Sequence, residues 1–168
     1  RVRGASMATA GMVVACYGAG AAISSAIGGY LADHWGRRAT MVAALTLGGA
    51  GVIALGFAHD VAVIAPACFF IALVAEGYRP GMQAMVTDVV PPADRVRAFG
   101  LIYWVINFGV SIGLSLGGWL ATRSFKLLFI GDGLTSIIFG LLVWRMVPET
   151  KHLATGGGPR QAHGDAHL

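Results

Sequence analysis

Charged residues are scarce in this chain. Of its 168 residues, 12% are Asp, Glu, Lys or Arg, whereas 56% are hydrophobic, and the mean hydropathy is +0.70. A soluble domain carries about 25% charged residues, and half that supply leaves too little polar surface to cover so many apolar side chains. The composition therefore excludes a soluble globular enzyme and a disordered tail, and it predicts that the chain is solvated by lipid.

Cysteines and catalytic motifs are scarce as well. Cys16 and Cys68 lie inside apolar stretches, without a second Cys or His at the spacing of a metal site, so neither a disulfide scaffold nor a metal centre is expected. The sequence contains no G-x-S-x-G, H-E-x-x-H or P-loop motif, which argues against an enzyme. The net charge of +4 does not come from a basic run with interleaved aromatic residues, so we expect no nucleic acid partner.

Long apolar runs are what the sequence has in abundance. A membrane-spanning helix needs about 20 mainly apolar residues, whereas a membrane strand needs about 10 with alternating polarity. Five runs have the length of a helix: about 5–32, 39–58, 61–87, 96–121 and 125–147. They predict an all-α, polytopic membrane helix bundle with five transmembrane helices, because helices satisfy their own backbone polar groups in lipid. We expect residues 1–151 to form this bundle and residues 152–168 to form a flexible tail.

The positions of Lys and Arg predict the orientation, since cytoplasmic loops carry an excess of both. One side of the membrane would hold seven of them: Arg37, Arg38, Arg95, Arg97, Arg145, Lys151 and Arg160. The other side would hold four: Arg1, Arg3, Arg123 and Lys126. We therefore expect a multi-pass protein of the cell membrane, with residues 33–38 and the C-terminal tail in the cytoplasm.

The third apolar run contains charged residues. Glu76, Arg79, Gln83 and Thr87 follow one another at steps of three, four and four, which places them on one face of a helix. A charge at the centre of a membrane helix costs about 2.5–3.5 kcal/mol, and pairing Glu76 with Arg79 would lower that cost. Two interpretations stay open: an ion pair that fixes helix packing, or a charged position on a substrate or proton pathway. Asp132, in the last run, either joins that pathway or reaches the outer interface.

Small residues at helical spacing predict packing faces. In lipid, such residues let helix backbones approach closely. One stripe in the first run comprises Gly11, Ala15, Gly18, Ala22, Ser25 and Gly29, and the fourth run repeats glycine at Gly109, Gly113 and Gly117. Another side of the fourth run carries the polar stripe Tyr103, Asn107, Ser111 and Ser115. This stripe either lines a cavity or bonds a neighbouring helix.

The loop after the first run carries a recognisable signature. Residues 29–38 read GYLADHWGRR, and Gly29, Asp33, Gly36, Arg37 and Arg38 occupy defining positions of the pattern G-x-x-x-D-[RK]-x-G-[RK]-[RK]. The loop resembles that of the major facilitator superfamily, with a histidine where the family usually has Arg or Lys. On physical grounds we expect Asp33 to cap the next helix, Gly36 to permit a tight turn, and both arginines to lie at the cytoplasmic interface.

A second pattern, G-x(8)-G-x(3)-G-P-x-x-G-G, is typical of the proton-coupled drug antiporters of that superfamily. Gly100, Gly109, Gly113, Gly117 and Gly118 match it, with leucine in place of the proline. The resemblance implies that these glycines form a helix-packing motif. It also makes the five spans similar to helices two to six of a twelve-helix transporter, so the chain is expected to be a piece of the N-terminal half of a longer protein.

The resemblance further implies roles for individual residues. Glu76, Arg79, Asn107 and Asp132 would line or bias a central cavity, and Arg79 would be the fourth-helix arginine often assigned to proton coupling. Glu76 is the first candidate to carry the proton. Three residues of the loop would latch the cytoplasmic side against the missing second half or a partner chain: Asp33, Arg37 and Arg38.

The expected function is secondary active transport by alternating access. The family implies proton-coupled efflux of small amphipathic compounds across the lipid bilayer, with the proton gradient in place of a cofactor. Two alternatives stay open: an uptake transporter for sugars or metabolites of the same superfamily, and a truncated membrane protein that does not transport.

Overall fold

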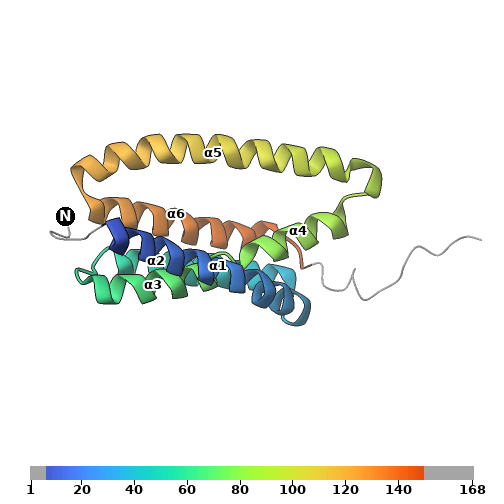
Figure 1. Ribbon diagram of the computed structural model, residues 1–168. Coiled ribbons are helices and arrows are strands. Elements are labelled where there is room, and N and C mark those ends of the chain that lie inside the picture. Colours follow the sequence, from blue (N-terminus) through green and yellow to red (C-terminus); the bar gives the residue numbers. More distant parts are fainter. Residues whose placement is uncertain (1–6, 150–168) are drawn as a thin grey trace, which may run out of the picture.

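The computed structural model describes residues 7–149, and all regular structure in that range is helical (Figure 1). The helices are α1 (Met7–His34), α2 (Arg37–Leu55), α3 (Val61–Ala75), α4 (Tyr78–Val89), the 3-10 turn η1 (Pro92–Asp94), α5 (Arg95–Arg123) and α6 (Phe125–Met146). By length and composition, five segments can cross a membrane, with α3 and α4 counted together as one span, Ala62–Val89. The predicted all-α bundle with five membrane helices is confirmed, and the predicted tail at 152–168 lies outside the described residues.

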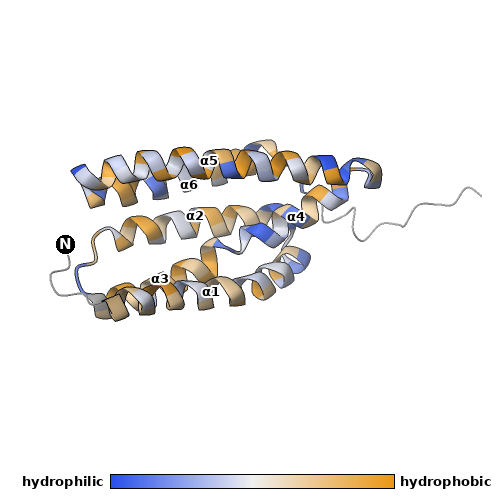
Figure 2. Cartoon of the chain, turned by 45° about the horizontal axis from the view of Figure 1, so that its top comes forward, coloured by the Kyte–Doolittle hydropathy of each residue, from blue (hydrophilic) through white to orange (hydrophobic). Residues whose placement is uncertain are grey.

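Side chains of the connecting loops cap the N-termini of two of these helices. The Asp60 carboxylate accepts a hydrogen bond from the backbone N–H of Ala62 at the start of α3. The Ser124 hydroxyl does the same for the N–H of Leu127 at the start of α6. Such caps satisfy backbone donors that have no partner within the first turn. Hydrophilic residues gather at the ends of the helices and around α4, and apolar residues cover the helix sides (Figure 2).

The bundle core is built from two close helix pairs, α1 against α3 and α2 against α6. On α1 the buried residues are Gly20, Ser24, Gly28 and Ala32. The predicted stripe that ends at Gly29 is therefore not packed within residues 7–149, since a methyl group built on Gly11, Gly18 or Gly29 meets nothing within 4 Å, and its packing role stays a prediction. Two stripes of small residues run along this helix, and only contact with α3 and α4 distinguishes them.

The third span is broken in the middle, contrary to the single helix predicted over 61–87. α3 ends at Ala75, and α4 begins at Tyr78. Pro80 has no N–H to donate to the carbonyl of Glu76, which instead accepts a bond from the N–H of Arg79. α1 approaches the break so closely that a methyl group built on Gly28 would lie 2.8 Å from the carbonyl oxygen of Gly77.

α5 stands apart from this core. None of its residues is buried, and its main neighbour among the described helices is α6 (Figure 1). A methyl group built on Gly100, Gly109, Gly113 or Gly118 meets no atom within 4 Å, and one on Gly117 meets only the Cδ1 atom of Leu128, at 3.5 Å. The close packing expected of this glycine motif is thus not made within residues 7–149, and the packing role stays a prediction.

Candidate functional site

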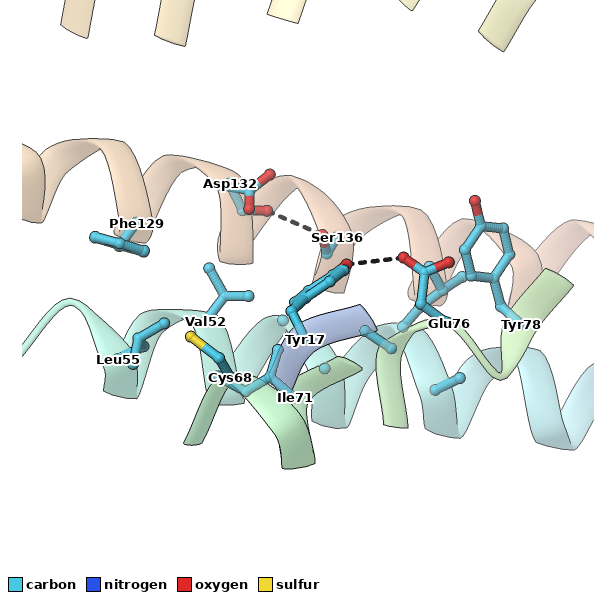
Figure 3. A pocket seen from close by; sticks show the side chains of 15 residues that line it. Tyr17, Val52, Leu55, Cys68, Ile71, Glu76, Tyr78, Phe129, Asp132 and Ser136 are labelled. Atoms are coloured by element: carbon cyan, nitrogen blue, oxygen red, sulfur yellow. Dashed lines mark hydrogen bonds between the residues drawn. The ribbon is translucent and has the colours of Figure 1, made fainter. Parts of the chain in front are cut away.

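A cavity of about 340 Å³ lies beside the break, between α1, α2, α3 and α6. Its walls are mostly apolar and include Val52, Ile71 and Phe129 (Figure 3). Glu76 and Asp132, two of the residues predicted for a central cavity, both line it. The fold therefore brings two carboxylates from distant parts of the sequence to one apolar space.

The Glu76 carboxylate is held by donors from two other helical segments. The hydroxyl of Tyr17 on α1 donates to its Oε1 atom at 2.8 Å, and Nε of Arg79 in α4 donates to its Oε2 atom. The side chain of Glu76 is 19% exposed, whereas that of Arg79 is 57% exposed. The predicted Glu76–Arg79 pair is confirmed as a contact. The sequence placed both residues on one continuous helix. In the structure, Glu76 follows the last residue of α3 and Arg79 lies in α4, so the ion pair spans the helix break.

Tyr17 is a polar residue of this cavity that sequence reasoning missed. It lies in a long apolar run, and 59 positions separate it from Glu76. No local spacing links the two residues. The only available signal was a tyrosine hydroxyl in a segment expected to be surrounded by lipid, where a polar group needs a partner.

Asn107 is not brought to the cavity by the described residues. Its Nδ2 atom donates to the carbonyl of Tyr103 at 2.7 Å, and the hydroxyls of Ser111 and Ser115 each bond the carbonyl four residues earlier. The polar stripe of α5 is therefore bonded to its own helix. The cavity role of Asn107 stays a prediction.

A second polar site lies in the loop between α1 and α2. The backbone N–H groups of Arg37 and Arg38 donate to the carboxylate of Glu149, at 2.9 and 3.2 Å. Glu149 thus caps α2, and the expectation that Asp33 caps it is wrong. Gly36 adopts φ +112°, as the predicted tight turn requires, and a methyl group there would lie 2.5 Å from Oε2 of Glu149.

Arg37 connects three helices at this end of the bundle. Its Nε atom lies 2.6 Å from Oδ2 of Asp88 at the end of α4, and its Nη1 atom lies 3.3 Å from Oδ1 of Asp33 at the end of α1. Arg37 is 7% exposed, so its guanidinium is buried among the helix ends, and its place at the cytoplasmic interface stays a prediction. Asp88 and Glu149 were not predicted for this site, because their contacts join residues far apart in the sequence.

The comparisons with known proteins decide the family. The model of the Major Facilitator Superfamily matches residues 2–165. The chain belongs to this superfamily. The resemblance of the loop at Gly29, Asp33, Gly36, Arg37 and Arg38 is thereby confirmed at the level of the family, and the bundle is a partial fold of the superfamily.

Named superfamily members are similar to the chain at low identity. "Multidrug resistance protein MdtH" of Salmonella typhi is 29% identical over 132 residues, which are 79% of this chain and 33% of that protein. "Na(+), Li(+), K(+)/H(+) antiporter" of Planococcus maritimus is 30% identical over 128 residues, which are 73% of this chain and 30% of that protein. The chain thus spans about a third of the length of these relatives.

Proposed function

We propose that the chain is part of a secondary active transporter that exports small amphipathic compounds in exchange for protons. The carrying observation is the Glu76 carboxylate, which sits in a largely apolar cavity at a helix break and is paired with Arg79. Acidic groups within membrane helices are costly and mark ion or proton pathways. The name of the MdtH relative supports drug export.

In the proposed mechanism, Glu76 carries the proton. Protonation removes the negative charge that faces Arg79 and so weakens the ion pair that spans the break. The two half-spans α3 and α4 are then less tightly tied to each other. A change in proton occupancy would thereby change the shape of the cavity wall, which is what coupling to alternating access requires.

The loop site supplies the proposed cytoplasmic latch. Arg37 ties the ends of α1, α2 and α4 together through Asp33 and Asp88. The Asp33 side chain is 68% exposed. This exposure supports the proposal that Asp33, together with Arg38, engages the second half of the transporter, while Arg37 holds the latch in shape.

Exchange of monovalent cations for protons is a second candidate. It is favoured by the presence of two carboxylates, Glu76 and Asp132, in one cavity, since hard cations prefer carboxylate oxygens. The name of the Planococcus relative supports it. In this version Asp132 would take part in holding the cation.

The first measurement is the intact mass of the native polypeptide that carries this sequence. A product more than twice the 17.4 kDa of the chain would restore the missing helices within one molecule. A product near 17.4 kDa would require a second chain for transport, or would mean that the protein does not transport.

The function itself is tested in proteoliposomes with an imposed pH gradient. Ethidium serves as the amphipathic probe, Na⁺, Li⁺ and K⁺ as the cation probes, and glucose as an uptake probe. We expect Glu76→Gln to abolish gradient-driven movement of the transported probe, and Asp94→Asn, an exposed carboxylate in η1, to leave it unchanged. Full transport by Glu76→Gln would contradict the proposed role of Glu76.

A further inference from the structure

Tyr17 is a polar residue of the cavity to which the proposed coupling assigns no role. It lies on the side of α1 that faces α3 and the break, one turn before the buried Gly20. Its hydroxyl reaches across to Oε1 of Glu76 (Figure 3). This contact ties the long helix α1 to the residue at which α3 ends.

The two hydrogen bonds of Glu76 have different consequences. The bond from Arg79 comes from only three positions away in the sequence, so it holds Oε2 close to its own chain segment. A carboxylate held at one oxygen can still rotate about its side-chain torsions. The second donor, Tyr17, holds Oε1 from another helix, and two donors on separate elements fix both the position and the plane of the group.

We propose that Tyr17 is a positioning residue that orients the Glu76 carboxylate toward the cavity and couples its state to α1. This role rests on the proposed function of Glu76 as the proton carrier. When Glu76 is ionised, both of its oxygens accept bonds. When it is protonated, the bond from Tyr17 loses its charge assistance, and the contact between α1 and the break weakens.

The helix α2 offers no side chain that could replace the hydrogen bond from Tyr17 to Glu76. Besides Tyr17 and Glu76, the titratable residues that line the cavity are Cys68 from α3, Tyr78 from α4 and Asp132 from α6. Arg79 of α4 contacts Glu76. The α2 wall contributes only apolar side chains and glycines. The hydroxyl of Ser136 on α6 bonds the backbone carbonyl of Asp132 at 3.0 Å.

The experiment uses the native polypeptide with Tyr17→Phe, which removes one oxygen and keeps the ring. Tyr103→Phe is the matched control, because Tyr103 is a tyrosine on an exposed membrane helix and is 74% exposed. The infrared carboxylate band of Glu76 is first identified from the difference between the wild type and Glu76→Gln. We expect Tyr17→Phe to shift this band and Tyr103→Phe to leave it in place. Size-exclusion profiles confirm that each variant is folded.

Transport in proteoliposomes gives a second readout. We expect Tyr17→Phe to lower the gradient-driven rate about 10-fold, the loss that corresponds to one hydrogen bond to a charged group. Because Glu76→Gln is expected to abolish gradient-driven movement, the double variant is compared with Glu76→Gln in exchange of the probe without a pH gradient. If Tyr17 acts through Glu76, adding Tyr17→Phe to Glu76→Gln should cause no further loss of this exchange. A 10-fold additional loss in the double variant would overturn the proposal.

The two readouts separate this proposal from the proposed function. An unshifted infrared band in Tyr17→Phe would overturn the positioning role even if transport depended on Glu76. A shifted band combined with full transport by Glu76→Gln would support the positioning of the carboxylate by Tyr17 and contradict the assignment of Glu76 as the proton carrier.

Discussion

The α2–α6 pair and the helix α5 both carry glycines at helical spacing, yet their surroundings are opposite. A methyl group built on Gly49 of α2 would lie 2.6 Å from the carbonyl oxygen of Gly133 on α6. A methyl group built on Gly113 of α5 meets nothing within 4 Å. Spacing of small residues therefore indicates which faces can pack closely, and it does not indicate which faces do.

The polar groups of the two regions differ in the same way. At the start of α2, Arg37 is 7% exposed and forms ion pairs with Asp33 at the end of α1 and Asp88 at the end of α4. On α5, the hydroxyls of Ser111 and Ser115 bond carbonyls of their own helix. Polar side chains of the core make contacts between helices, whereas those of α5 bond the backbone of α5 itself. Substitutions in the two regions should therefore change the free energy of unfolding by different amounts.

The largest difference is expected for arginines. Arg37→Met removes the ion pair with Asp88, whose side chain is 13% exposed, and breaking a buried pair in this way costs about 3 kcal/mol. Arg97→Met, on the exposed first turns of α5, should change the free energy of unfolding by less than about 0.5 kcal/mol. Denaturant unfolding of the native polypeptide in detergent micelles measures both.

Equal losses for the two arginine variants would contradict this account. Such a result would mean that the charge on α5 is as deeply engaged as that of Arg37. A double variant, Arg37→Met with Asp88→Leu, sharpens the test. It removes the carboxylate that faced Arg37 as well and should recover part of the lost stability.

A smaller difference is expected for glycines. Gly49→Ala forces α2 and α6 apart at their closest approach and should lower the free energy of unfolding by about 2 kcal/mol. Gly113→Ala has open space around it and replaces glycine with a better helix former, so it should leave stability unchanged or raise it. Thermal unfolding in the same micelles compares the two.

The glycine on α5 also reports on what lies beyond the described residues. If Gly113→Ala destabilises the native polypeptide as much as Gly49→Ala does, another helix packs against this face. That outcome would support the packing role predicted for the glycine motif. It would also end the contrast between α5 and the core.

The membrane spans could be predicted from the sequence because the length of an apolar run fixes the length of a membrane helix. The Glu76–Arg79 pair was predictable for a related reason, since its partners lie three positions apart. The position of the helix break was not predicted. Pro80 has no N–H to donate to the carbonyl of Glu76, four residues earlier. The helix is therefore interrupted before the proline and not at the proline itself.

The parts that could not be predicted depend on contacts between helices. Glu149 caps α2 from more than a hundred residues away, and nothing in the local sequence distinguishes it from Asp33 as the cap. The face of α1 that is buried within residues 7–149 was not predicted for the same reason, because two stripes of small residues satisfy the same spacing rule. Tertiary contact selects between such equal candidates.

The smallest difference is expected for serines, and it tests whether polar groups in the two regions are satisfied differently. Ser24 on α1 is 0% exposed, and its hydroxyl has no hydrogen-bond partner among the described residues. Ser24→Ala removes a buried unsatisfied group and should raise the free energy of unfolding by about 1 kcal/mol. Ser111→Ala on α5 removes a bond within one helix and should change the free energy of unfolding by less than about 0.5 kcal/mol.

A loss of stability in Ser24→Ala would show that the hydroxyl has a partner in the native polypeptide. A loss near 1 kcal/mol in Ser111→Ala, above the roughly 0.6 kcal/mol average of hydrogen bonds between membrane helices, would mean that the polar stripe bonds a helix beyond the described residues.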